Sequence, residues 1–267
     1  MRYEAPRTLE SAVALLAGVT GSAQILAGGT DLLVRLRSGF AEPDLILDIK
    51  RIDAMNAITA EGGGWRIGAA VSGAEMGEHD GLKADWPGVV EATELIGSTQ
   101  IQGRASLGGN LCNASPAADS VPAMVAANAV ARVVGPNGTR EVAVGDIATG
   151  PGKTSLAKGE IVASIFLPAR PARSGDAYLR FIPRTEMDIA VVGVGVSLTL
   201  DDDGRLGVRL AVEGIARFVE IRIIREEIDG VWVTGLPEQA SVIVVGQEFV
   251  RDGRSIAPTI LDRATDR

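Results

Sequence analysis

The chain has 267 residues, of which 46% are hydrophobic and 22% are charged, and it carries a formal net charge of −8. These values are typical of a soluble globular protein, and the length suits two domains. The acidic balance argues against nucleic acid and anionic membranes as partners, because both require a basic face.

Metal-binding side chains are scarce. Cys112 is the single cysteine and His79 the single histidine. The chain therefore cannot by itself form an internal disulfide, hold an iron–sulfur cluster or build a multi-histidine metal site. The sequence opens without the apolar core of a signal peptide, and no run approaches the ~18–20 apolar residues of a membrane span. We therefore expect a cytoplasmic location.

Residues 1–55 predict a compact β-α-β unit. Thr8 is the expected N-cap of its first helix and Gly18 the expected stop. The expected elements are a helix over 8–16, a strand over 24–27, a helix over 30–37 and a buried strand over 44–49.

Residues 56–170 mix helices with antiparallel strands. Pro87 separates two helix candidates, and Pro136-Asn137-Gly138 is a hairpin turn. The expected elements are a strand at 65–69, helices at 72–82, 88–95 and 120–129, and strands at 131–134, 141–144 and 161–167.

Residues 168–175 are rich in proline and arginine and are the best candidate for a linker. Beyond them we expect an antiparallel C-terminal region. Its expected strands lie at 177–184, 189–200, 205–212, 231–234 and 241–245, with a tight turn at 201–204.

Two glycine pairs each follow an apolar run. The first lies in Ala27-Gly28-Gly29-Thr30-Asp31-Leu32-Leu33 and the second in Ser106-Leu107-Gly108-Gly109-Asn110. Glycine lets a backbone approach a ligand closely, and hydroxyl and amide side chains donate to phosphate and sugar groups. We therefore predict two turns that face each other across one diphosphate, that of a dinucleotide, specifically FAD.

Each of these features also has a simpler interpretation. A glycine pair alone is more often only a turn. Asp31 and Asp119 suit a helix cap as well as a sugar hydroxyl. Cys112 has no histidine or lysine near it in the sequence to activate it, so we interpret it as a packing residue. We interpret His79, in a polar helix, as solvated.

Two further glycine-containing runs are excluded as nucleotide motifs. Residues 150–154 end like a phosphate-binding P-loop, but Ile147 stands where that motif needs a glycine, so a loop is predicted. Residues 193–195 begin like a dinucleotide fingerprint, but Leu198 replaces its third glycine, so a strand is predicted.

At these residues the chain resembles the FAD-binding (medium) subunit of molybdenum hydroxylases. This family includes the carbon monoxide dehydrogenase medium subunit and the flavin domain of xanthine dehydrogenase. The resemblance covers roughly residues 1–212. It rests on the two glycine segments and continues through 114–120, 150–154, 159–162 and 178–184. Residues 213–267 do not match the family pattern, which a divergent tail and a shift of reading frame would both explain.

The resemblance implies an α+β fold. Residues 1–170 would form a two-subdomain FAD-binding fold of the vanillyl-alcohol-oxidase (PCMH) type, with subdomains of about 1–55 and 56–170. Residues 176–267 would form a small C-terminal α+β domain with an antiparallel sheet, atypical after about 212. Ile96 matches a residue near the flavin ring, and Arg180 stands where a lysine is common. The implied cofactor-binding residues are Ile25, Leu26, Ala27, Gly28, Gly29, Thr30, Asp31, Leu32, Ile96, Ser106, Leu107, Gly108, Gly109, Asn110, Asp119, Val162 and Arg180; no catalytic residue and no metal ligand is implied.

The resemblance further implies that this protein carries the last redox group of an electron-transfer chain. Substrate would be oxidised at a molybdopterin centre on a large subunit. Electrons would pass through [2Fe-2S] clusters of a small subunit to FAD on this chain, and then to an external acceptor. The implied assembly is a dimer of heterotrimers. The single cysteine excludes the branch with an extra iron–sulfur cluster in this subunit. A stand-alone flavin oxidase and a flavin-free scaffold subunit are the alternatives.

Overall fold

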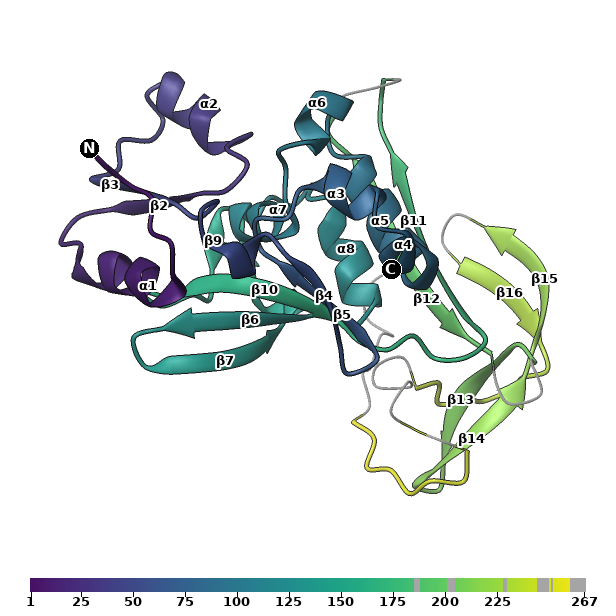
Figure 1. Ribbon diagram of the computed structural model, residues 1–267. Helices are drawn as coiled ribbons and strands as arrows, with labels where there is room; N and C mark the ends of the chain where they lie inside the picture. Colours follow the sequence, from purple (N-terminus) through teal and green to yellow (C-terminus); the bar gives the residue numbers. More distant parts are fainter. Residues whose placement is uncertain (185–187, 201–204, 228–229, 244–249, 251, 260–267) are drawn as a thin grey trace. The chain divides into compact units, whose positions relative to one another are not determined.

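The computed structural model describes residues 1–184, 188–200, 205–227, 230–243, 250 and 252–259 (Figure 1). The chain divides into two compact units, Met1–Leu198 and Thr199–Arg267. Each unit is described by itself.

A three-stranded parallel sheet opens the first unit. In it β1 (Arg2–Glu4) and β2 (Ala23–Leu26) flank the central β3 (Leu45–Asp48). Two helices, α1 (Leu9–Gly18) and α2 (Leu32–Arg37), connect these strands in turn. The predicted β-α-β pattern is therefore confirmed, and the first glycine pair follows an edge strand.

The start of α1 confirms the predicted N-cap. Thr8 Oγ1 accepts a hydrogen bond from the Ser11 amide at 3.2 Å. Ala12, Val13 and Leu16 form the buried stripe of this helix, so that its burial and its capping both follow from the sequence pattern.

A five-stranded antiparallel sheet occupies the middle of the first unit, in the order β4-β5-β10-β6-β7. Six of the seven residues of its central strand are buried. The predicted strands at 65–69, 131–134, 141–144 and 161–167 are confirmed. The strands are β4 (Ile58–Glu61), β5 (Gly64–Gly68), β10 (Ile161–Leu167), β6 (Val130–Gly135) and β7 (Gly138–Ala143).

Between β5 and β6 the chain forms short helices. α7 packs on β10, and α5 and α8 pack on β11 (Ser174–Phe181). These helices are α3 (Gly73–Gly77), α4 (Asp80–Asp85), α5 (Pro87–Glu94), α6 (Thr99–Gln102), α7 (Leu107–Asn113) and α8 (Ser120–Ala126).

The prediction of a single helix over 72–82 is wrong, and so is the interpretation of His79 as a solvated side chain. Its Nδ1 accepts from the Leu82 amide at 3.0 Å and so caps the new helix α4. The imidazole also packs edge-to-face on Trp65, with ring centroids 4.8 Å apart. A side chain that serves as an N-cap begins a helix where simple periodicity predicts continuation.

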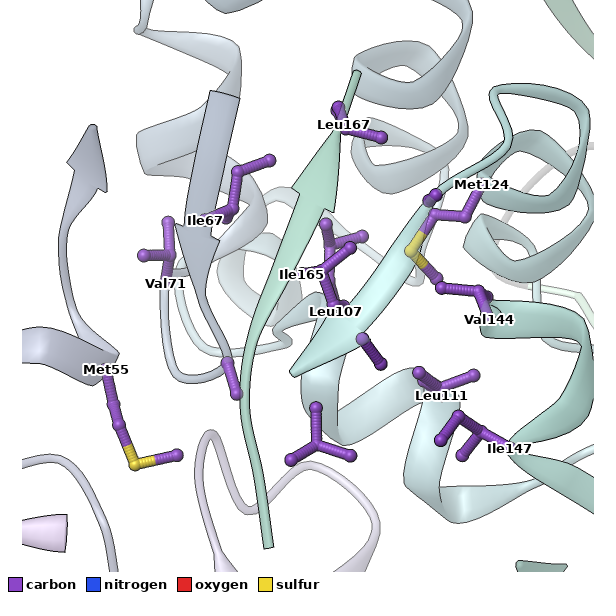
Figure 2. Close-up of a cluster of buried hydrophobic side chains, with 14 of the residues drawn as sticks. Met55, Ile67, Val71, Leu107, Leu111, Met124, Val144, Ile147, Ile165 and Leu167 are labelled. Atoms are coloured by element: carbon purple, nitrogen blue, oxygen red, sulfur yellow. The ribbon is translucent and has the colours of Figure 1, made fainter. Parts of the chain in front are cut away.

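One buried apolar cluster joins these elements (Figure 2). Leu107 and Leu111, one turn apart on α7, are both fully buried in it, together with Ile165 of β10 and Met124 of α8. Burying one such side chain stabilises the fold by roughly 1.5–3 kcal/mol. The cluster therefore holds α7, which carries the second glycine pair, firmly in place.

Smaller elements complete the first unit. The 3₁₀ turns η1 (Asp53–Met55) and η2 (Val144–Asp146) flank the sheet strands in sequence. β8 (Ala148–Gly150) and β9 (Lys153–Thr154) form a tight antiparallel hairpin. β11 (Ser174–Phe181) pairs with β12 (Val192–Thr199). The two strands confirm those predicted near 177–184 and 189–200, including the extended conformation of 193–195.

The second unit holds two antiparallel hairpins in its described part. β13 (Gly207–Val212) pairs with β14 (Ile215–Glu220), and β15 (Arg222–Glu227) pairs with β16 (Gly230–Thr234). The predicted strands at 205–212 and 231–234 are confirmed. Val242 forms a single bridge with Leu210. The turn predicted at 201–204 and the end of the strand predicted at 241–245 lie outside the described residues.

Candidate functional site

A cavity of about 560 Å³ lies in the first unit, and both glycine pairs line it. Thirteen of the seventeen residues named from the sequence line this cavity. They are Ile25, Ala27, Gly28, Gly29, Thr30, Asp31, Leu32, Ile96, Ser106, Gly108, Gly109, Asn110 and Val162. The volume is within the roughly 300–1,000 Å³ of pockets that bind small ligands and cofactors.

The first glycine pair lies between β2 and α2. A Cβ at Gly28 would stand 1.8 Å from the carbonyl oxygen of Arg104. No side chain fits at Gly28, because the backbone that leads into the second glycine segment passes directly against it. Gly29 has φ +77°, in the left-handed region that glycine adopts without strain. The two glycine segments therefore meet in space, although they are about 80 residues apart in the chain.

The second glycine pair is helical, so the turn predicted there is wrong. Ser106 is the N-cap of α7, and its Oγ accepts from the Gly109 amide at 3.2 Å. A Cβ at Gly108 would lie 2.6 Å from Ala69, against which α7 packs. At Gly109 the nearest described atom would be Ser106 Oγ, at 3.1 Å. Gly109 is thus the glycine that keeps the cavity wall bare.

Polar side chains tie the two segments together. Asn113 Nδ2 donates to Asp31 Oδ1 at 3.3 Å, and both residues line the cavity. Asp31 makes no side-chain capping bond within the described chain, so capping does not account for it. Asn110 Oδ1 accepts from the hydroxyl of Ser120 at 2.6 Å and from its amide at 3.3 Å. The amide group of Asn110 is thereby held at the cavity wall.

The hairpin β8–β9 forms a further wall that sequence reasoning treated as a plain loop. Gly152 and Thr154 line the cavity, and the Gly152 amide donates to the carbonyl of Ala114, just after α7, at 3.0 Å. The loop predicted at 150–154 is instead part of a short antiparallel hairpin.

Several lining residues were not among those named from the sequence. Arg35 lies four residues after Asp31, and Asn113 lies four residues after Gly109, a helical spacing that brings each onto the same face as its predecessor. That spacing was the signal available for both. The unnamed lining residues are Ala23, Gln24, Arg35, Ile49, Ala69, Ala105, Cys112, Asn113, Gly152, Thr154, Leu156 and Ile161.

Four of the named residues are absent from the described cavity lining. Leu107 is fully buried in the apolar cluster, and the Leu26 side chain lies under Gly29. Asp119 and Arg180 pair with each other, with Arg180 Nη1 3.3 Å from Asp119 Oδ2. Asp119 makes no capping bond among the described residues of α8.

The described cavity lining contains few charged side chains. Arg35 and Asp31 are the only charged side chains among the described lining residues. Burial raises the pKa of the Cys112 thiol to about 12, so the thiol is protonated at neutral pH. Cys112 also packs on the apolar cluster, which confirms its interpretation as a packing residue.

Metal-ion sites and membrane spans are the remaining kinds of feature. Within the described ranges, three or more His, Cys, Asp or Glu side chains never gather in a way that would hold a metal ion. None of the helices in those ranges is long and apolar enough to cross a membrane.

The residues present fit a dinucleotide. Hydroxyl and amide groups from Thr30, Asn110 and Thr154 offer neutral donors, and the bare backbone at Gly109 admits a bulky phosphate group. Ile25, Ile96 and Val162 provide apolar wall. Neutral donors beside an apolar surface suit a ligand with a diphosphate and flat rings. The fold and the cavity therefore define a dinucleotide-cofactor-binding protein.

The particular family follows from sequence comparison. Residues 1–170 match the family described as the FAD binding domain in molybdopterin dehydrogenase. The chain belongs to this family, and FAD is its cofactor, which confirms the resemblance seen in the motifs. It is an FAD-binding oxidoreductase subunit of the molybdenum hydroxylases.

Individual relatives of the chain are also FAD-binding subunits or medium chains of dehydrogenases. A xanthine dehydrogenase FAD-binding subunit of Escherichia coli O157:H7 is 34% identical over 82% of this chain and 75% of its own length. The carbon monoxide dehydrogenase medium chain of Hydrogenophaga pseudoflava is 31% identical over 80% of this chain and 74% of its own. A solved carbon monoxide dehydrogenase from Hydrogenophaga pseudoflava, lacking the Mo-pyranopterin moiety, matches with a TM-score of 0.72 at 27% identity. That match covers 96% of this chain and 82% of the other, and it confirms the α+β, PCMH-type fold.

Proposed function

We propose that the 560 Å³ cavity is where the chain holds FAD, with the diphosphate between Gly28–Gly29 and Gly108–Gly109. The observation that carries this proposal is the convergence of both glycine pairs on one cavity. Each pair is held there by backbone packing that excludes a side chain at Gly28 and Gly108. Gly109, where a Cβ would meet only Ser106 Oγ beyond its own helix, is the least obstructed of the four glycines in these pairs.

The other lining residues supply hydrogen-bond donors, a positive charge and an apolar wall. Thr30, Asn110, Asn113 and Thr154 donate hydrogen bonds, and Arg35 supplies the positive charge that a diphosphate requires. Ile96 and Val162, with Ile25, form the apolar wall that excludes water from the bound rings. Leu26 and Leu107 support the two glycine segments from behind. We also propose that residues 1–170 are the FAD-binding domain and residues 176–267 a separate C-terminal domain.

When bound, FAD supplies redox chemistry, because a flavin exchanges electrons singly and in pairs. Within this chain the residues bind and orient the cofactor, and no acid–base pair takes part. We propose that electrons arrive from iron–sulfur clusters of a small partner subunit, fed by a molybdopterin-containing large subunit, and leave to an external acceptor. The names of the relatives support a subunit role, since they include medium chains and a complex subunit. A cytoplasmic dimer of heterotrimers is the proposed assembly.

The test is the visible spectrum of the full-length purified chain, followed by co-purification. A flavin absorption spectrum with about one FAD per chain is the expected result. Co-purification with an iron–sulfur protein then supports the electron outlet, whereas flavin-dependent oxidation of a small molecule by the chain alone supports a stand-alone oxidase. Absence of flavin, with no uptake of added FAD, would contradict the proposal and leave the scaffold role.

A further inference from the structure

A series of polar contacts runs from β1 to the first glycine pair. Tyr3 donates its hydroxyl to Asp48 Oδ2 at 2.6 Å, and the Lys50 ammonium lies 2.8 Å from Asp48 Oδ1. The same ammonium donates to the carbonyl oxygen of Ala27 at 3.1 Å. Tyr3 belongs to β1, Asp48 ends β3 and Ala27 follows β2. The series therefore joins all three strands of the parallel sheet to the residue directly before Gly28.

Asp48 is the fixed member of this series. Its side chain is only 9% exposed, and its Oδ1 also accepts from the Lys50 amide at 3.0 Å. Burial by itself would raise the pKa of the Asp48 carboxyl, but hydrogen bonds from Lys50 and Tyr3 bring that pKa below its ordinary value. The carboxylate is therefore ionised at neutral pH, and its several donors hold the ammonium in one place.

The Ala27 carbonyl lies where the backbone leaves the sheet. β2 and β3 pair in register as far as Leu26 and Asp48, and the Ile49 amide donates to the Leu26 carbonyl at 3.1 Å. The next carbonyl, that of Ala27, receives the Lys50 ammonium in place of a strand partner. A side chain here thus satisfies a backbone acceptor at the point where the strand pairing ends.

The Ala27 carbonyl belongs to the same peptide group as the Gly28 amide. This peptide is planar and trans, so its C=O and N–H bonds point in opposite directions. Holding the Ala27 carbonyl on Lys50 therefore also fixes the direction of the Gly28 N–H. Ala27 and Gly28 both line the cavity, so the direction of this amide decides whether it can donate to a ligand there.

We propose that Lys50 is a positioning residue for the first glycine turn, which it fixes by bonding the Ala27 carbonyl while Asp48 holds its ammonium. This inference rests on the proposed function, since it assumes that the FAD diphosphate lies at that turn. Lys50 acts through the peptide between Ala27 and Gly28, and Asp48 acts through Lys50. The role differs from that of Arg35, which supplies positive charge at the cavity wall.

The test is fluorescence titration of the full-length apoprotein with FAD. Lys50→Met should raise the FAD dissociation constant about fivefold, the change that one lost hydrogen bond typically causes. Lys50→Arg keeps the charge and the donors, so it should restore most of the affinity.

The matched control is Lys83→Met. Lys83 also donates to a backbone carbonyl, that of Gly77 at 3.4 Å, and its ammonium lies 3.8 Å from Glu94 Oε1. None of these three residues is among the described lining residues of the cavity. The loss of Lys83 should therefore leave the dissociation constant unchanged.

Ionic strength separates positioning from a through-space attraction between Lys50 and the cofactor. Salt screens such an attraction, whereas the effect of a lost positioning hydrogen bond persists. The difference between the wild type and Lys50→Met should therefore remain at about 0.5 M NaCl. A difference that disappears in that buffer would overturn the proposal, and so would wild-type affinity of Lys50→Met at low salt.

A double-mutant cycle tests whether Asp48 acts through Lys50. Asp48→Asn should weaken FAD binding about threefold in the wild type and hardly at all in the Lys50→Met background. Additive effects of the two substitutions would overturn the proposal. Should Lys50→Met not fold, Asp48→Asn carries the test alone, and an unchanged dissociation constant would then contradict the proposal. Failure of the wild-type apoprotein to bind FAD would instead refute the proposed function.

Discussion

The two glycine pairs occupy different kinds of structure, and only their first members have the same role. Gly28–Gly29 lies in the loop after β2, whereas Gly108–Gly109 lies in the first turn of α7. In each pair the first glycine is required by backbone packing, against Arg104 in one case and Ala69 in the other. The second glycines differ from each other. Gly29 has a left-handed φ, and a Cβ there would meet the side chains of Leu33 and Leu26, whereas a Cβ at Gly109 would meet only Ser106 Oγ, at 3.1 Å.

The residues of a glycine pair can therefore have separate roles. Mutating Gly28 or Gly108 tests packing, mutating Gly29 tests the backbone conformation, and mutating Gly109 tests binding.

Gly28→Ala is expected to cause the largest loss of stability. The new Cβ would stand 1.8 Å from the Arg104 carbonyl oxygen, and the atoms that it meets there are all backbone, which cannot move aside as a flexible side chain can. We expect the free energy of unfolding to fall by about 3 kcal/mol or more, as for severe overpacking. Urea denaturation measures it. Gly18→Ala, where the new Cβ would meet no described atom within 4 Å, is the control and should be nearly neutral.

Gly109→Val should leave the fold intact and abolish FAD binding. A Cβ at this position would stand 3.1 Å from Ser106 Oγ, which is a tight contact, but valine is otherwise tolerated at least as well as glycine in a helix. The free energy of unfolding should therefore change by only about 1 kcal/mol. Its branched side chain would project into the space assigned to the diphosphate. The visible spectrum of the purified variant gives the flavin content. The control is Gly150→Val, at a position outside the described cavity lining, which should keep its flavin. A Gly109→Val protein that also keeps its flavin would contradict the assigned position of the diphosphate.

Asn113→Ala should weaken FAD binding about fivefold. It removes the hydrogen bond to Asp31 that joins the two glycine segments, and such a bond contributes about 1 kcal/mol. Asp31→Asn can keep a hydrogen bond of the same shape, so its effect should be smaller. Titration of both apoproteins with FAD measures the difference. Equal dissociation constants for the wild type and Asn113→Ala would show that the bridge contributes nothing to binding.

The smallest effect concerns pH and a pair outside the cavity. Hydrogen bonding from Arg140 lowers the pKa of Glu160 to about 2, from its ordinary 4.5. Because the folded-state pKa is lowered, the stabilisation is fully present above pH 4.5 and is lost as pH falls toward 2. Glu160→Gln should therefore lose less melting temperature than the wild type as the pH falls from 4.5 toward 2, while its FAD affinity at neutral pH stays unchanged. The same loss of melting temperature in both proteins would contradict this assignment.

Much of the first unit is predictable from local pattern. Thr8 as a cap, the strand before Gly28 and the hairpin at 136–138 all follow from rules that act over a few residues. The cavity lining near both glycine pairs follows from the motifs. Local signals therefore identify well the segments that line the cavity.

What the sequence could not provide depends on distant contacts. Glycine is a poor helix former, so the pattern predicts a turn at Gly108–Gly109. The burial of Leu107 and Leu111 and the cap of Ser106 override that preference. Likewise, Thr154 reaches the cavity only because its hairpin bonds to the carbonyl after α7. The pairing of Arg180 with Asp119 joins residues 61 positions apart.

The most direct test of the account is a crystal structure of the full-length chain grown with FAD. The account predicts one FAD per chain in this cavity, with its diphosphate between Gly29 and Gly109. A diphosphate located elsewhere on the chain, with side chains filling the space between those two glycines, would contradict it.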